Sequence, residues 1–230
     1  MSKIGILTSG GDAPGMNACI RACVRSAKHY GIEPVGIKRG YHGLINGDFT
    51  PMNSNSVSNI IHRGGTILGS ARSVEFRSKK GRKQAYNQLK KAGINKMVVI
   101  GGDGTFTGAT IFHEEYPDVS IVGAPGTIDN DLYGTDFSIG YDTAINTAMQ
   151  AIDKIKDTAS SHDRMFIIEV MGRHAGFIAI RTGLAVGAEA VLAPEYKTDV
   201  NQIVEIIRAR NLKKNSSSII VVAEGDEIGG

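Results

Sequence analysis

Short, mainly apolar runs divide this chain, and they limit its possible folds more than any other feature. They are rich in β-branched residues and do not alternate with polar residues, which is typical of strands buried on both faces of a parallel sheet. The runs are Ile4–Leu7, Val35–Ile37, Met97–Ile100, Ile121–Val122, Phe166–Val170, Ala190–Ala193 and Ile219–Ala223. Helix-like stretches lie between them, at Asn17–His29, Lys79–Ala92, Thr143–Thr158 and Asn201–Arg208. The alternation predicts a three-layer α/β/α fold with mostly parallel sheets.

A boundary between two lobes is predicted near Gly140. The long polar stretch 126–140 contains several glycines and lies between an expected strand and an expected helix that Asp142 or Thr143 would cap. The expected lobes are residues 1–140 and 141–230.

Composition and charge narrow the class of protein. Lys and Arg outnumber Asp and Glu only by 26 to 23, so the net charge of +3 predicts neither a nucleic-acid partner nor an acidic membrane partner. No stretch of about 18 apolar residues occurs, and we expect a cytoplasmic protein with no membrane contact. Cys19 and Cys23 lie four residues apart in an expected helix, and small buried hydrophobes are a better interpretation than a disulfide or metal site.

Two glycine-rich segments, Thr8–Asn17 and Gly101–Thr105, each follow an expected strand and open an expected helix. Ligands of open parallel sheets bind beyond the carboxyl ends of the strands, where such turns present backbone N–H groups to phosphate oxygens. Neither segment matches the P-loop or the dinucleotide fingerprint. One glycine pair before a helix is more often structural, but two glycine–aspartate turns in one sheet favour a polyphosphate site.

Charged residues in the Gly101–Thr105 segment and in other parts of the chain indicate phosphoryl transfer. Asp103 beside phosphates would be repelled unless a magnesium ion lay between them, although a helix N-cap is the alternative interpretation. Asp129 or Asp131 could act as general base on an attacking hydroxyl. Arg72 and Arg173 could neutralise the transferring group. Asx-turns and surface ion pairs are the structural alternatives for these four residues.

At these residues the sequence resembles the bacterial ATP-dependent 6-phosphofructokinases, along its whole length. The matching segments are Thr8–Asn17 (TSGGDAPGMN), Arg63–Arg72 (RGGTILGSAR), Gly101–Thr105 (GGDGT), Pro125–Asp131 (PGTIDND), Asp157–His162 (DTASSH) and Glu169–Arg173 (EVMGR). GGDGT alone also occurs in NAD kinases and lipid kinases, whereas PGTIDND together with EVMGR distinguishes the phosphofructokinases. The resemblance implies two Rossmann-like lobes, the first binding ATP and the second the sugar phosphate.

The resemblance also implies a reaction, in which D-fructose 6-phosphate is phosphorylated at its 1-hydroxyl by Mg-ATP. Asp129 would be the base, Thr127 and Arg173 would contact the transferring phosphoryl group, and Asp103 would hold magnesium. The implied ATP site is Gly11, Tyr41, Arg72, Ser73, Gly102, Asp103, Gly104, Thr105 and Gly108. The implied sugar ligands are Thr127, Asp129, Asp131, Arg164, Met171, Gly172, Arg173 and Glu224.

The phosphoryl donor is implied by two glycines. Pyrophosphate-using relatives carry Asp where this chain has Gly104 and Lys where it has Gly126, and these side chains would fill space that the α-phosphate of a nucleotide needs. We therefore expect ATP as the donor, with open space beside both glycines.

Regulation and assembly are implied in the same way. In the family, Arg164 reaches a neighbouring subunit to hold the 6-phosphate, which implies a homotetramer. ADP and phosphoenolpyruvate would bind an effector site at a subunit interface. Its positions are Arg21, Arg25, Lys156, Gly187, Glu189 and Lys213. Lys156 stands where the family usually has Arg, and a solvated basic face is the alternative interpretation of Arg21 and Arg25.

Members of the family are longer than this chain, so we expect the second lobe to be incomplete at its carboxyl-terminal end. Whether the 230-residue piece is active alone stays open. The alternatives are a non-catalytic nucleotide-binding fragment or paralogue and a GGDGT-type NAD or lipid kinase.

Overall fold

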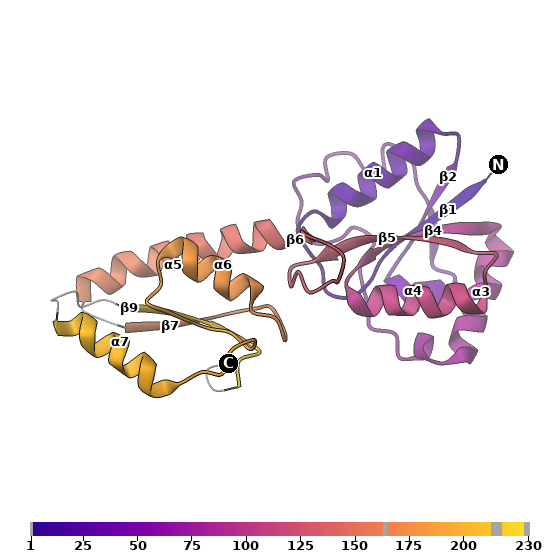
Figure 1. The fold of residues 1–230 in the computed structure, drawn as a ribbon. Coiled ribbons are helices and arrows are strands. Elements are labelled where there is room, and N and C mark those ends of the chain that lie inside the picture. Colours follow the sequence, from indigo (N-terminus) through magenta and orange to yellow (C-terminus); the bar gives the residue numbers. More distant parts are fainter. Residues whose placement is uncertain (1, 163–164, 213–217, 228–230) are drawn as a thin grey trace. The chain divides into compact units, whose positions relative to one another are not determined.

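The computed structural model describes residues 2–162, 165–212 and 218–227. They form two compact units (Figure 1). The amino-terminal unit comprises Met1–Thr127 and Ser138–Gly140, and the carboxyl-terminal unit comprises Ile128–Phe137 and Tyr141–Gly230.

A sheet with strand order β3-β2-β1-β4-β5-β6 forms the centre of the amino-terminal unit. The strands are β1 (Lys3–Thr8), β2 (Glu33–Ile37), β3 (Phe49–Pro51), β4 (Ile94–Gly101), β5 (Ser120–Thr127) and β6 (Ile139–Gly140). Every pairing is parallel except that of β2 with β3. Because β1 lies between β2 and β4, the strand order reverses beside β1, and such a switch point favours ligand binding at the carboxyl ends of the strands.

Helices cover both faces of this sheet, with α1 on one side and α3 and α4 on the other (Figure 1). The helices are α1 (Met16–His29), α2 (Gly40–Asn46), η1 (Glu75–Arg77, a 3-10 turn), α3 (Lys79–Ala92) and α4 (Asp103–Glu115). Apolar residues of the strands and of α2, α3 and α4 form one core, which includes Leu7, Leu44, Leu89, Val99 and Phe112. Cys19 and Cys23 are free thiols and are half-buried on α1, so they are less buried than expected.

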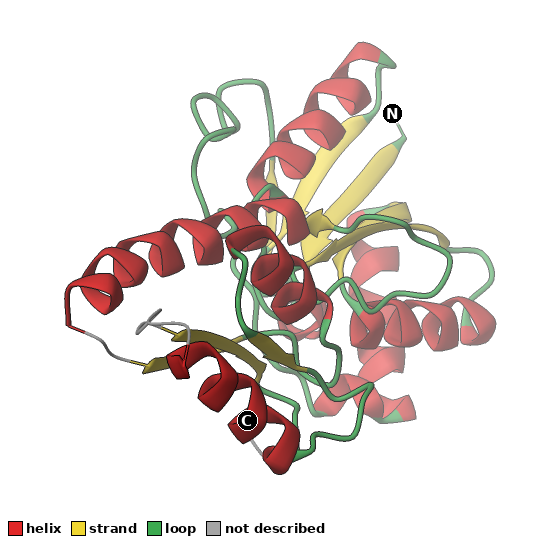
Figure 2. Ribbon diagram, turned by 60° about the vertical axis from the view of Figure 1, so that its left-hand side comes forward, coloured by secondary structure: helices red, strands yellow, loops and turns green. Residues whose placement is uncertain are grey.

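Three parallel strands in the order β7-β9-β8 form the sheet of the carboxyl-terminal unit. Figure 2 shows the helices and strands of the chain in separate colours. The elements are α5 (Tyr141–His162), β7 (Met165–Val170), α6 (Phe177–Val186), β8 (Ala190–Leu192), α7 (Val200–Leu212) and β9 (Ser218–Ala223). Val221 packs with α5 and α6 on one face of β9, and Ile220 packs with α7 on the other.

The predicted α/β/α fold with mostly parallel sheets is confirmed, while some details of the prediction are wrong. The helix α5 begins at Tyr141, so Asp142 lies in its first turn and neither Asp142 nor Thr143 precedes it as a cap. Strand β7 is not buried on both faces, because Ile167 is 61% exposed while α7 packs on β8 and β9. Within the described residues, no helix is both long and apolar enough to cross a membrane.

Candidate active site

Thr8, at the end of β1, joins the first glycine-rich segment to the segment Arg63–Arg72. Its side-chain oxygen lies 2.8 Å from that of Thr66 and donates to the carbonyl of Gly69 at 3.0 Å. Two motifs that the sequence leaves about sixty residues apart are therefore held together at the carboxyl end of β1.

Asn17, in the first turn of α1, fixes the same segment from the other side. Its amide nitrogen donates to the carbonyls of Arg63 and Gly64, and its amide oxygen accepts from the N–H of Ile67 at 2.7 Å. The side chain is buried and all its hydrogen-bonding groups are used on backbone, so it sets the path of the loop.

The second glycine-rich segment is built onto the first. Gly102 is the N-cap of α4, and its carbonyl accepts from the N–H groups of Thr105 and Phe106. The hydroxyl of Thr105 donates to the carbonyl of Ser9 at 3.2 Å, across 96 residues of sequence. The N-termini of α1 and α4, each a source of free N–H groups and partial positive charge, thus belong to one group of turns.

Tyr41 supports the Gly101–Thr105 turn through a hydrogen bond. It is buried in α2, and its hydroxyl donates to the carbonyl of Thr105 at 2.6 Å. Burial raises the pKa of Tyr41 well above its ordinary value, so the phenol stays protonated and remains a donor. The Tyr41 ring also lies against Gly108, where a Cβ would be 3.2 Å from a ring carbon. Both residues were predicted to lie in the ATP site, and in the structure Tyr41 contacts the Gly101–Thr105 turn and Gly108.

Gly11 and Gly104 have open space beside them, whereas Gly126 does not. A Cβ at Gly11 or Gly104 would meet no atom within 4 Å. A Cβ at Gly126 would meet the side chains of Ile100 at 3.1 Å and Met16 at 3.3 Å. The expectation of open space is therefore correct at Gly104 and wrong at Gly126, because Gly126 is buried in the sheet and core side chains fill its surroundings.

Asp103 is the first residue of α4 and is exposed. It does not cap the helix, since Gly102 does, and the N-cap interpretation is wrong. A single exposed carboxylate at a turn with phosphate-binding geometry suits magnesium, which is commonly held by one or two carboxylates together with substrate phosphates. The donor set therefore fits the predicted ion.

Arg72 and Ser73 end the loop that Thr8 and Asn17 hold. Arg72 is exposed, while the hydroxyl of Ser73 accepts from the N–H of Phe76 at 3.3 Å and so begins η1. Thr127, at the end of β5, lies beside the second glycine turn, where a Cβ on Gly102 would be 3.5 Å from that of Thr127. The predicted nucleotide residues of this unit therefore gather at one end of its sheet.

In the carboxyl-terminal unit, Asp129 and Arg173 form an ion pair. The Nε of Arg173 lies 3.4 Å from Oδ2 of Asp129, whose side chain is buried while that of Arg173 is largely exposed. Arg173 and Asn130 both have a left-handed backbone, with φ of 54° and 55°. Such conformations cost energy for residues with a Cβ and concentrate at functional sites.

Glu224, directly after β9, holds the turn that carries Arg173. Its Oε1 accepts from the N–H of Gly172 at 3.1 Å and from the N–H of Arg173 at 2.6 Å. Gly172 has a φ of 147°, and a Cβ there would lie 2.5 Å from the carbonyl oxygen of Ala175. The structure thus gives Glu224 a backbone-supporting contact. Asp131 and Met171 are exposed near these residues in the sequence, and Arg164 lies outside the described residues.

The predicted effector residues are divided between the two units. On α1, Arg21 donates to the carbonyl of Val57 at 2.5 Å, and Arg25 is exposed. In the other unit, the ammonium of Lys156 donates to the carbonyl of Val186, next to Gly187, and the carboxylate of Glu189 accepts from the N–H of Ile219. Lys213 lies outside the described residues.

Sequence reasoning gave no role to Thr8, Asn17, Thr66 or Ser9. All except Thr66 lie inside the Thr8–Asn17 motif, and an amide residue shortly after a glycine turn, Asn17, was the strongest signal that the sequence offered. Their partners are 46 to 96 residues away, which a local pattern does not reveal.

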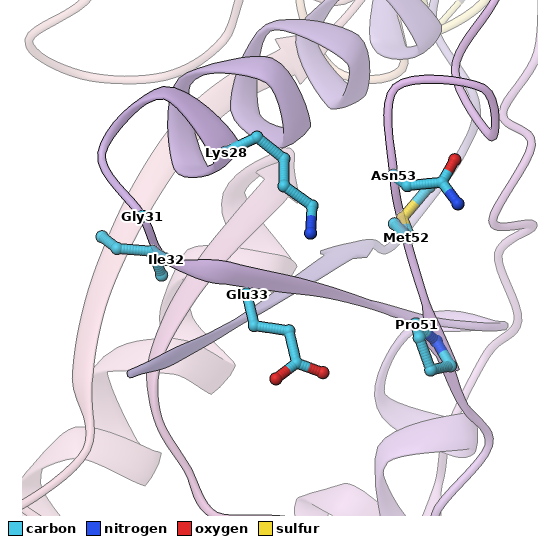
Figure 3. Close-up of a pocket in the computed structure, with 7 residues that line it drawn as sticks. All are labelled: Lys28, Gly31, Ile32, Glu33, Pro51, Met52 and Asn53. Carbon is cyan, nitrogen blue, oxygen red and sulfur yellow. The ribbon is translucent and has the colours of Figure 1, made fainter. Parts of the chain in front are cut away.

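A pocket of about 410 Å³ lies elsewhere in the amino-terminal unit (Figure 3). No residue predicted to bind ATP or sugar lines it. Its lining residues are Lys28, Gly31, Ile32, Glu33, Pro51, Met52 and Asn53.

Relatives of known name match the chain from end to end. "ATP-dependent 6-phosphofructokinase" from Cytophaga hutchinsonii is 56% identical over 229 residues, which is 100% of this chain and 70% of the relative. "ATP-dependent 6-phosphofructokinase 1" from Thermus thermophilus is 57% identical over 230 residues, 71% of its length. The predicted resemblance to ATP-dependent 6-phosphofructokinases is therefore confirmed.

Solved structures agree with the fold. Phosphofructokinase from Saccharomyces cerevisiae superposes with a TM-score of 0.94 at 39% identity, over 98% of this chain and 34% of that one. A pyrophosphate-dependent phosphofructokinase from Marinobacter aquaeolei, at 22% identity and a TM-score of 0.84, shares the fold. The family model described as Phosphofructokinase matches residues 3–229. Because that match and the identities both extend over nearly all its residues, the chain belongs to the phosphofructokinase family.

Proposed function

We propose that this protein transfers the γ-phosphoryl group of ATP to the 1-hydroxyl of D-fructose 6-phosphate, giving fructose 1,6-bisphosphate and ADP. The observation that carries the proposal is the ion pair of Asp129 with Arg173. A carboxylate that can accept the hydroxyl proton, beside a guanidinium that can neutralise phosphoryl charge, is what transfer to an alcohol requires. The names of the bacterial relatives support the same donor and acceptor.

The proposal assigns the nucleotide to the amino-terminal unit. Backbone N–H groups at Gly11, Gly102 and Gly104 would bind phosphate oxygens, helped by the N-termini of α1 and α4. Magnesium held by Asp103 would neutralise charge on the phosphates. The remaining residues assigned to ATP are Tyr41, Arg72, Ser73, Thr105 and Gly108.

The proposal assigns the chemical step to Thr127, Asp129 and Arg173. Asp129 takes the proton of the attacking hydroxyl, and the guanidinium of Arg173 lies 3.4 Å from its carboxylate. Thr127 and Arg173 contact the transferring phosphoryl group, Arg173 through a planar donor set suited to its oxygens.

The sugar is assigned to the carboxyl-terminal unit. Asp131, Met171, Gly172 and Glu224 would contact fructose 6-phosphate, and Arg164 would bind its 6-phosphate across a subunit boundary. The contact of Glu224 with two N–H groups supports a fixed Gly172–Arg173 turn beside this sugar.

The test compares the variant Asp129→Ser with Asp136→Ser, which replaces an exposed aspartate of the same loop. Loss of the base should lower turnover about 1,000-fold while sparing Mg-ATP binding, and Asp136→Ser should change neither. Activity is measured with fructose 6-phosphate, NAD and diacylglycerol as acceptors, on the 230-residue chain and on any longer natural form. Full turnover in Asp129→Ser would refute its role as base, and transfer without the sugar would refute the proposed acceptor.

We further propose a cytoplasmic homotetramer regulated by ADP and phosphoenolpyruvate. In the carboxyl-terminal unit, the ammonium of Lys156 donates to the carbonyl of Val186, and Gly187 follows as the C-cap of α6, so two of the proposed effector residues lie close together. Arg21, Arg25, Glu189 and Lys213 are the other proposed members.

A further inference from the structure

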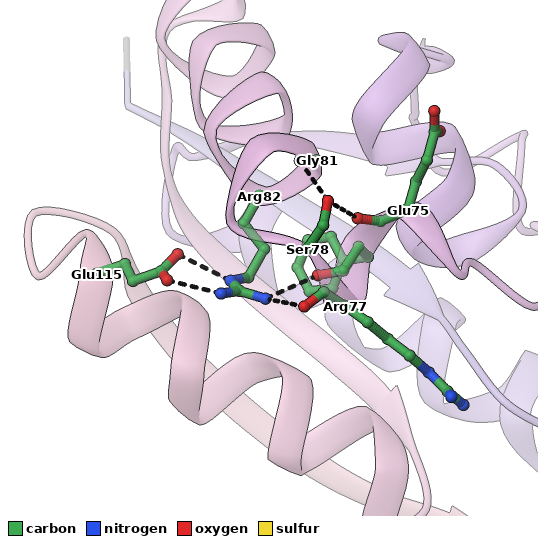
Figure 4. A network of polar contacts seen from close by, with 7 residues as sticks. Glu75, Arg77, Ser78, Gly81, Arg82 and Glu115 are labelled. Atoms are coloured by element: carbon green, nitrogen blue, oxygen red, sulfur yellow. Dashed lines mark hydrogen bonds and ion pairs between the residues drawn. The ribbon is translucent and has the colours of Figure 1, made fainter.

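Arg82 and Glu115 form a bidentate ion pair between α3 and α4 (Figure 4). The Nε of Arg82 lies 2.8 Å from Oε2 of Glu115, and its Nη2 lies 2.7 Å from Oε1. The side chains are only 11% and 21% exposed. Parallel, partly buried hydrogen bonds of this kind fix orientation far better than an exposed ion pair.

The third guanidinium nitrogen of Arg82 donates hydrogen bonds to the backbone of η1. Its Nη1 donates to the carbonyls of Phe76 and Arg77, at 3.1 Å and 2.7 Å (Figure 4). Glu115 therefore orients the guanidinium, and the guanidinium holds the backbone of the 3-10 turn. One side chain joins α3, α4 and η1.

The 3-10 turn in turn holds Tyr41 in place. The ring of Phe76, buried in η1, is stacked on the ring of Tyr41 with centroids 3.9 Å apart and planes 10° apart. The hydroxyl of Tyr41 donates to the carbonyl of Thr105. A continuous set of contacts thus runs from Arg82 through Phe76 and Tyr41 to the Gly101–Thr105 turn.

A second ion pair of α3 lacks this connection. Lys90 lies 3.0 Å from Asp118 in the segment after α4, with side chains 56% and 45% exposed. It links α3 to the region of α4, as Arg82 does, but it makes no contact with η1 among those the structure gives. Exposed pairs of this kind contribute little to stability. Lys90 is therefore a matched control for Arg82.

We propose that Arg82 is a positioning residue for nucleotide binding, which acts through Phe76 and Tyr41 to fix the Gly101–Thr105 turn. The inference rests on the proposed function, because it assigns this turn to the phosphates of ATP. Arg82 itself touches no substrate in this role. Glu115 serves by keeping the guanidinium aimed at the two carbonyls of η1.

The first experiment needs no nucleotide. Amide hydrogen exchange at Thr105 and Phe106, which donate to the Gly102 carbonyl, is compared in the unaltered chain, Arg82→Lys, Glu115→Gln and Lys90→Gln. Exchange should be about tenfold faster in the first two variants and unchanged in the third. Unchanged exchange in Arg82→Lys overturns the inference, whether or not the chain binds ATP.

The second experiment measures the dissociation constant for Mg-ATP and the urea midpoint of unfolding. Arg82→Lys and Glu115→Gln should weaken binding about tenfold, and Lys90→Gln should not. The charge-reversed variant Arg82→Glu/Glu115→Arg can restore an ion pair, but it cannot restore the bonds to the Phe76 and Arg77 carbonyls. It should regain stability without regaining affinity.

Recovery of affinity together with stability in the reversed variant would show that the pair is merely structural and would overturn the inference. Absence of ATP binding in the unaltered chain would contradict the proposed function instead. In that case the exchange rates at Thr105 and Phe106 still decide whether Arg82 positions the turn.

Discussion

Two glycines of one turn, Gly101 and Gly104, differ in what surrounds them. A Cβ at Gly101 would lie 2.5 Å from the carbonyl oxygen of Ser9 and 2.4 Å from Oγ1 of Thr105. Gly104 has open space. Gly101 is therefore required by the approach of the two glycine-rich segments, whereas Gly104 is required, in our proposal, only by the ligand.

The comparison of Gly101→Ala with Gly104→Ala tests this distinction. Gly101→Ala should lower the free energy of unfolding by about 1–3 kcal/mol, because backbone must move to admit the methyl group. Gly104→Ala, in the first turn of α4, should raise it by about 0.5–1 kcal/mol while weakening Mg-ATP binding. Urea unfolding and calorimetric titration measure both. Equal stabilities would contradict the close approach at Gly101.

At the scale of elements, we expect the contact of α3 with α4 to depend on pH. Hydrogen bonding to Arg82 holds the pKa of the Glu115 carboxyl below its usual range, and Lys79 adds to the effect. Its folded-state pKa is therefore lower than its unfolded-state pKa. The ionised carboxylate stabilises the folded state above the ordinary glutamate pKa of about 4.3, and this contribution is lost as the pH falls through the lower folded value.

The prediction compares Glu115→Gln with Glu114→Gln, which replaces an exposed neighbour on the same helix. At about pH 7 Glu115→Gln should be the less stable chain, and its deficit relative to the unaltered chain should shrink as the pH falls below about 4.3. Glu114→Gln should follow the unaltered chain throughout. Urea midpoints over this range give the result. A deficit that is constant with pH would show that the charge of Glu115 does not stabilise the contact.

At the scale of the whole molecule, the residues proposed to bind effectors belong to different units. Arg25 belongs to the amino-terminal unit, and Lys156 and Glu189 belong to the carboxyl-terminal unit. In the proposed tetramer, each effector would bind where subunits meet. Because the proposed site lies between subunits, one experiment should measure both effector affinity and the oligomeric state.

Arg25→Ala is compared with Lys28→Ala, which removes the same charge from the same helix. Arg25→Ala should weaken phosphoenolpyruvate binding about tenfold, since a charge-assisted hydrogen bond is lost, and Lys28→Ala should not. Calorimetric titration measures affinity, and sedimentation equilibrium measures assembly. Equal affinities would remove Arg25 from the site, and a monomer at every concentration would refute the tetramer.

The sequence by itself determined the fold class and the family. Apolar runs of two to five residues, such as Ile219–Ala223, need only local β preference and burial to predict a parallel strand. Glycine–aspartate turns after such strands predicted where a phosphate would bind. Both are short-range patterns, so both are visible without three-dimensional structure.

The tertiary structure decided which residues support the turns. Each supporting contact involves residues that are distant in the sequence. Thr105 bonds to Ser9, Arg82 pairs with Glu115, and the side chains of Ile100 and Met16 fill the space beside Gly126. Glu224 likewise finds its partners 51 and 52 residues away. Such contacts depend on how close packing brings whole elements together, and no local pattern of residues encodes that distance.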